Sequence, residues 1–159
     1  MKRGKQDLEA DLRSLIFGIA KHCRAEAEKR FSDAKINITP FQHAIMKATD
    51  SAGSAEEATI HGIAAKIGVQ PPSLIPPLDS LEKLKYIKRS VNQKDRRKIL
   101  LELTPLGKKI EERISSLRKM GCLSKALANI SIPKQKQILN LLKDLNAALP
   151  KSRYTRKAC

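Results

Sequence analysis

The chain contains few aromatic residues and few cysteines. Aromatic residues make up 3% of the 159 positions and tryptophan is absent, which argues against single-strand and RNA-binding platforms that depend on base stacking. The three cysteines, Cys23, Cys122 and Cys159, are odd in number and widely spaced. They form neither a disulfide framework nor a zinc-binding pattern, so a reducing cytoplasm is the expected compartment.

Long apolar runs and catalytic motifs are also missing. The apolar run Leu15–Ala20 is far shorter than a membrane span, and the acidic segment Asp7–Asp11 before it is unlike a secretory signal. No glycine-rich phosphate loop, paired-carboxylate motif or nucleophile–base spacing is present. His22, His43 and His61 are too scattered to suggest a metal site. We therefore expect no enzymatic activity, no cofactor and no segment inserted in a membrane.

Positive charge, in contrast, is in large excess. The chain has 32 Lys and Arg against 16 Asp and Glu, a formal net charge of +16, and 41% hydrophobic residues, which suffice for a core. A compact domain with this charge repels itself unless something anionic shares its surface. Composition therefore favours a nucleic acid or an acidic membrane as partner. The densest positive run is Lys83–Lys98.

Apolar residues recur at helical spacing in the first part of the chain. They predict a first helix over Leu8–Phe31, with Cys23 on its apolar face as a buried, inert thiol. Thr39-Pro40 is typical of an N-cap followed by proline in the first helical position, so a second helix begins there. The small, acidic stretch Ser51–Ala58 is expected to be a loop. A third helix follows, from about Thr59 to Gly68.

The second half begins with a change of hydrophobic period. Two short β-type runs, Tyr86–Val91 and Lys98–Leu103, flank the polar, basic turn Asn92–Arg97 and predict a hairpin. Thr104-Pro105 is a second cap-and-proline pair, which opens a helix expected to run into the 120s. A last helix begins at Ser131–Pro133. The predicted fold class is mostly α (α+β), with one small antiparallel β-hairpin.

One stretch has the features of a helix-turn-helix. Ala64 is the small residue where two helices cross, Gly68 marks the turn, and Val69 and Leu74 dock the second helix on the first. A basic hairpin directly follows. The combination predicts a winged helix-turn-helix, whose second helix enters the major groove of DNA while the hairpin, or wing, reaches the minor groove and phosphates.

These segments resemble the MarR family, and within it the SlyA branch. The resemblance lies in Thr59–Val69, in two parts of the recognition element, and above all in Asp95–Gly107. The two parts of the recognition element, which spans Gln70–Lys83, are Gln70–Ile75 and Leu78–Lys83. That last segment is similar to the family pattern of D-x-R, alternating apolar residues and L-T-x-x-G. The similarity covers residues 39 to about 110, and outside them only the helical pattern agrees.

The resemblance implies which residues contact DNA. On the wing, Arg97 would enter the minor groove and Asp95 would brace its guanidinium. Independently of the resemblance, some of the lysines and arginines from Lys83 to Arg89 are expected to position phosphates and the others to be solvated surface charges. The complete set of expected DNA-contacting residues is Gln70, Pro71, Pro72, Ser73, Leu74, Pro76, Lys83, Lys88, Arg89, Lys94, Asp95, Arg96, Arg97 and Lys98.

The recognition element departs from the family pattern at two positions. The family usually has Arg or another polar residue where Pro76 stands, and Thr or Leu where Pro77 stands. Inside a helix that began at Pro71, each ring would cost about 3 kcal/mol or more. We therefore predict a kinked helix, or one that restarts with Ile75 as cap and Pro76 as first residue and ends near Leu84, after an extended or single-turn entry at Pro71-Pro72. Proline offers no hydrogen bond to a base, so readout by Gln70 and Ser73 and contacts with thymine methyl groups would remain.

The predicted organisation has four parts. Residues 1–38 and 105–150 form N- and C-terminal dimerisation helices, 39–104 form the winged DNA-binding domain, and 151–159 form a basic tail. The apolar stripes of the end helices are too long for the winged core to cover, which favours a homodimer, as the resemblance also implies.

The expected function is a cytoplasmic MarR-type transcription regulator that binds double-stranded DNA, acting as a repressor. The resemblance alone implies a small anionic, often phenolic, ligand near the junction of dimer and DNA-binding regions, which would shift the spacing of the two DNA-binding lobes. Two alternatives remain open. One is an architectural protein that coats DNA without sequence preference, and the other is a winged-helix interaction module that has lost specific DNA binding.

Overall fold

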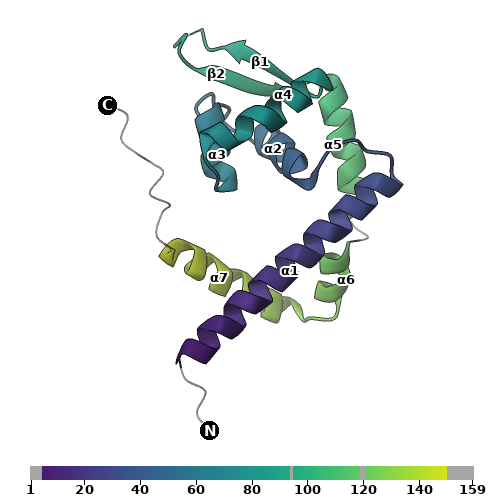
Figure 1. Cartoon of the computed structure of the whole chain (residues 1–159), viewed down its shortest axis with the longest axis vertical. Coiled ribbons are helices and arrows are strands. Elements are labelled where there is room, and N and C mark those ends of the chain that lie inside the picture. The colour runs from purple at the N-terminus through teal and green to yellow at the C-terminus, as the bar shows by residue number, and fades with distance from the viewer. Residues whose placement is uncertain (1–4, 94, 119–120, 150–159) are drawn as a thin grey trace. The chain divides into compact units, whose positions relative to one another are not determined.

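The chain is mainly helical and carries one small β-hairpin, as the sequence predicts (Figure 1). The computed structural model describes residues 5–93, 95–118 and 121–149. In chain order the elements are α1 (Lys5–Asp33), α2 (Pro40–Asp50), α3 (Ile60–Ile67), the 3₁₀ turn η1 (Pro71–Leu74), α4 (Ile75–Lys83), β1 (Ile87–Val91), β2 (Ile99–Leu103), α5 (Pro105–Arg118), α6 (Cys122–Ala128) and α7 (Ile132–Ala148).

The chain divides into two compact units, Met1–Gly121 and Cys122–Cys159. In the second unit, Gln135 closes the turn between α6 and α7 by donating two 2.8 Å hydrogen bonds, to the carbonyls of Leu127 and Ile130. The prediction of one helix from Pro105 into the 120s is wrong, since Gly121 is not helical and a new helix begins at Cys122. Glycine is a poor residue for a helix interior because its backbone loses the most freedom there.

The helix starts and the turn of the motif follow local chemistry. Thr39 and Gln42 form a reciprocal capping box at the start of α2, with bonds of 3.1 and 2.8 Å. Thr59 caps α3 by accepting a hydrogen bond from the backbone of Gly62 at 3.0 Å. Gly68 ends α3 with φ of 73°, a left-handed conformation that glycine adopts without a steric cost. The predicted boundaries of both helices are confirmed.

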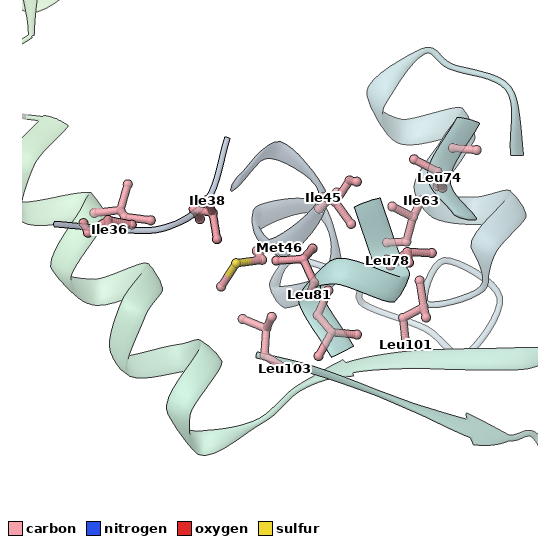
Figure 2. Packing of buried hydrophobic residues seen from close by; sticks show 14 of the residues in the cluster. Ile36, Ile38, Ile45, Met46, Ile63, Leu74, Leu78, Leu81, Leu101 and Leu103 are labelled. Carbon is pink, nitrogen blue, oxygen red and sulfur yellow. The ribbon is translucent and has the colours of Figure 1, made fainter. Parts of the chain in front are cut away.

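A single apolar core joins these elements in the first unit (Figure 2). Its centre consists of side chains with almost no exposed surface, drawn from α2, α3, η1, α4, the hairpin and α5: Ile45, Met46, Ile63, Leu74, Leu78, Leu81, Ile87, Leu101 and Ile114. Leu74 docks the recognition element on this core, as the motif requires. The inclusion of Leu74 among the expected DNA contacts is therefore wrong, because a side chain with 0% exposure cannot reach DNA.

The recognition element is broken, as its prolines predict. A 3₁₀ turn over Pro71–Leu74 gives the single-turn entry, and α4 then begins at Ile75. The cap is Leu74, one residue earlier than predicted. Pro76 consequently lies in the first turn of α4, where backbone N–H groups have no intrahelical acceptor, so the missing donor there costs little.

The hairpin is antiparallel, with Ile87 opposite Leu103 and Val91 opposite Ile99. A bridge between Thr59 and Leu100 ties the start of α3 to β2. The hairpin lies beside α4 (Figure 1), so wing and recognition element are held on one scaffold.

Each unit exposes a large apolar helix face. On α1 the residues Leu8, Leu12, Leu15, Ile16, Phe17 and Ile19 are 44–70% exposed. Cys23, expected to be buried, is only partly buried. In the second unit, none of the described side chains of α6 or α7 is buried, and large apolar residues along α7 are exposed: Ile132, Ile138, Leu139, Leu141, Leu142 and Leu145.

Candidate nucleic-acid interface

The tip of the recognition element presents small and apolar groups to solvent. Pro72, Ser73 and Pro76 are exposed, and Ile75 is 41% exposed, whereas Gln70 and Pro71 are half-buried. The surface results from the break at the prolines, because Leu74 turns into the core and leaves its neighbours outside.

Arg89 of β1 neutralises the acidic side of α4. Its guanidinium lies 2.6 Å from Asp79 Oδ1 and 3.4 Å from Glu82 Oε2. The Arg89 side chain is only 26% exposed. The predicted phosphate contact at Arg89 is thus occupied by carboxylates of the recognition element, and the pairing fastens the wing to α4.

Two lysines of the wing are also paired with acids. Lys88 Nζ lies 2.7 Å from Glu102 Oε2 on the opposite strand. Lys98 Nζ lies 2.6 Å from Glu56 Oε2, in the loop between α2 and α3. The hydrogen bond to Glu56 raises the pKa of Lys98 above its usual value. The basic hairpin predicted from the sequence therefore offers less unpaired charge than its composition indicates.

Arg96 and Arg97 at the wing tip remain available. Both are exposed, and no ion pair joins either of them to the rest of the described chain. Asp95 accepts a hydrogen bond from the main-chain N–H of Arg97 at 3.1 Å, rather than from the guanidinium as expected, so it shapes the turn and leaves the Arg97 side chain free. Lys94 lies outside the described residues. Lys83 is exposed at the end of α4.

A groove of about 670 Å³ lies between the end of α1, the start of α2 and α4. Phe31, Ile36 and Ile38 contribute apolar walls, and Lys83 and Glu28 contribute the charged groups. Lys83 therefore borders both this groove and the outer surface of the recognition element.

A largely buried contact between His43 and Glu111 joins α2 to α5. His43 Nε2 lies 2.9 Å from Glu111 Oε2, with side chains 14% and 10% exposed, and Phe31 meets the His43 ring edge-on. Burial raises the pKa of Glu111, but His43, Ser115 and Lys47 together outweigh burial and hold this pKa below its usual value. Sequence reasoning missed this pair, since nothing local links two residues so far apart in the chain.

The similarity of this chain to known proteins is a similarity to solved structures. No family model matches, and no curated protein matches. Solved structures do match over almost the whole chain. The S. aureus MepR–DNA complex aligns with TM-score 0.75 at 21% identity, over 86% of this chain and 97% of that one. E. coli MarR C80S complexed with operator DNA aligns with TM-score 0.74 at 21% identity, over 93% and 100%.

The chain has the MarR-type winged-helix fold. The repressor CouR bound to a DNA duplex aligns equally well, with TM-score 0.75 at 18% identity over 92% of this chain and 99% of that one. The MarR-type fold includes the N- and C-terminal helices flanking the winged region, as predicted.

Metal clusters and membrane-spanning helices were sought in the residues that the structure describes, and neither is found there. Across 5–93, 95–118 and 121–149, no group of three or more His, Cys, Asp and Glu could hold a metal ion. None of the helices described is both long and apolar enough to cross a membrane.

Proposed function

We propose that this protein is a MarR-type transcription regulator that binds duplex DNA in the cytoplasm as a homodimer and acts as a repressor. The observation that carries the proposal is the pairing of an exposed recognition element with an exposed arginine tip on one scaffold. Several structures of the same fold contain DNA. In our proposal the tip of η1 and α4 enters the major groove, while Arg96 and Arg97 meet the minor groove and phosphates.

The homodimer follows from the uncovered apolar faces. The face of α1 from Leu8 to Ile19 and the apolar side of α7 are too large and continuous to stay in water on a soluble monomer. A second copy of the chain is the simplest cover, and a two-fold dimer matches the symmetry of paired DNA half-sites. Light scattering on the purified chain is expected to give twice the chain mass, and Leu12→Glu with Leu15→Glu to give the monomer.

A small anion is proposed for the groove beside Lys83. The groove borders both the end of α1 and the recognition element, so a molecule bound there would favour one relative placement of the two over another. Calorimetry with 4-hydroxybenzoate, a phenolic anion, is expected to show binding and to weaken DNA affinity in parallel. Heat of binding without any change in DNA affinity would contradict the regulatory part.

DNA binding itself is tested by fluorescence anisotropy on the region upstream of the protein's own gene and on random duplex, over a salt series. Tighter binding to the upstream region, and reduced reporter expression from that region, are expected of a specific repressor. The recognition element has few base-reading donors, which keeps the architectural protein as a second candidate. Equal affinity for both DNAs at every salt concentration supports that candidate, and no binding at low salt supports the interaction module.

A further inference from the structure

Between its two end residues, the recognition element lacks the side chains that usually read bases by hydrogen bonds. Guanine is recognised mainly by Arg or Lys and adenine by Asn or Gln, and none of these lies between Gln70 and Lys83. Asp79 and Glu82 could accept from cytosine, but Arg89 already holds both carboxylates. Hydrogen-bond readout is therefore restricted to Gln70 and the serines.

The same element carries an apolar tip, Ile75 and Pro76, whose side chains are not buried in the core. Leu74, Leu78 and Leu81 are fully buried and fill the inner face, while Ile75 is 41% exposed and Pro76 is exposed beside it. Both lie at the N-terminal end of α4, the end of a recognition helix that meets base edges. Two apolar residues therefore stand where other helix-turn-helix proteins place donors.

Lys83, at the other end of α4, would set the orientation of the apolar tip relative to DNA. Lys83 follows Pro76 by seven residues, or two helical turns, so both project from nearly the same face about 10 Å apart. Lys83 is exposed. With Lys83 on a phosphate, the tip points into the groove that this phosphate borders.

The apolar group on the floor of the major groove is the methyl group on pyrimidine C5, carried by thymine or by 5-methylcytosine. We propose that Ile75 and Pro76 recognise DNA by burying these C5-methyl groups, so that each half-site presents a methylated pyrimidine to the start of α4. This inference rests on the proposed DNA-binding function. Burial of one methyl-sized group corresponds to about fourfold in affinity.

The test removes the methyl group and leaves every hydrogen-bonding edge intact. Duplexes bound by the full chain are selected from a random pool and resynthesised with deoxyuridine in place of thymidine. A second pair of duplexes carries cytosine or 5-methylcytosine at the same positions. Anisotropy at one salt concentration is expected to show a loss of about fourfold for each contacted methyl, in both pairs.

Two variants separate methyl recognition from altered DNA shape. Ile75→Ser combined with Pro76→Ser replaces two exposed side chains and retains Pro77 in the first turn of α4, and a thermal melt verifies its fold. It is expected to bind the uracil duplex as wild type does and to lose the preference for thymine. Lys83→Ala is the matched control, expected to weaken both duplexes equally and to keep the preference.

The outcomes of these measurements distinguish failure of the inference from failure of the proposed function. Equal affinity of the wild type for thymine and uracil duplexes overturns the inference and leaves the proposed function standing. A thymine preference that survives in the serine variant overturns the assignment to Ile75 and Pro76. Failure to select any duplex overturns the proposed function together with the inference.

Discussion

Replacing Arg97 with alanine tests whether the wing tip binds DNA through the unpaired charge of this side chain. The side chain is exposed, and no described acid pairs with it, while its main-chain N–H is held by Asp95. Removing the side chain therefore leaves the turn intact. The free energy of unfolding should stay within about 0.5 kcal/mol of wild type, as for other surface substitutions.

The effect on DNA binding follows from the charge removed. A hydrogen bond to a charged group is worth about 1.5 kcal/mol at the lower end, or roughly tenfold in affinity for each wing. Each phosphate no longer neutralised lowers the slope of log affinity against log salt by about 0.9, so a dimer that loses Arg97 from two wings loses about 1.8.

Lys98→Ala is the matched comparison, because it removes a like charge from the same hairpin. In the free protein Lys98 is bound to Glu56 at 2.6 Å, so its removal should change the salt slope by less than half as much as Arg97→Ala. Both slopes are measured by anisotropy on one duplex over a salt series. If Arg97→Ala leaves affinity and slope unchanged, or if Lys98→Ala has the larger effect, the distinction between paired and unpaired charges is refuted.

Three further substitutions test the scaffold. Arg89→Gln removes two surface ion pairs and should lower the free energy of unfolding in urea by about 0.5–2 kcal/mol; an unchanged value would mean that the pairs contribute nothing. The pKa of Glu111 is lowered in the folded chain beside His43. The ionised Glu111 therefore stabilises the fold above its unfolded pKa, and this stabilisation is lost as the pH falls through its folded pKa. Glu111→Gln should make the free energy of unfolding less dependent on pH in that acid range, and a pH–stability curve parallel to that of wild type would contradict this prediction. Gly107→Ala would place a Cβ against the carbonyl oxygen of Tyr86, and a thermal melt should show a loss of about 1–3 kcal/mol.

Local chemistry accounts for most of the fold that could be predicted. Cap-and-proline pairs located the starts of α2 and α5, and the left-handed Gly68 located the turn of the motif. The broken recognition element followed from Pro76 and Pro77, because a missing donor and a ring clash act within one turn of helix. The break before α6 was missed, since a lone glycine gives only a weak local signal.

The candidate interface was predicted less completely. Its location followed from the motif and the basic hairpin. Which of its basic side chains are paired with carboxylates did not. Of the basic residues expected to contact DNA, Lys88, Arg89 and Lys98 are paired with carboxylates. Leu74 was assigned to both the core and the interface, and its complete burial leaves only the core.

The sequence by itself determined how much charge the chain carries, where its helices start, and that its recognition element cannot be one regular helix. These properties depend on composition and on neighbours within a few residues. Only the tertiary structure decided which charges are free, because an ion pair depends on distance in space. Glu56 reaches Lys98 across 42 positions of the chain, and Arg89 turns from the wing to α4. The excess of positive charge is a property of the sequence. That Arg96 and Arg97 are exposed and not paired with acids of the described chain is a property of the fold.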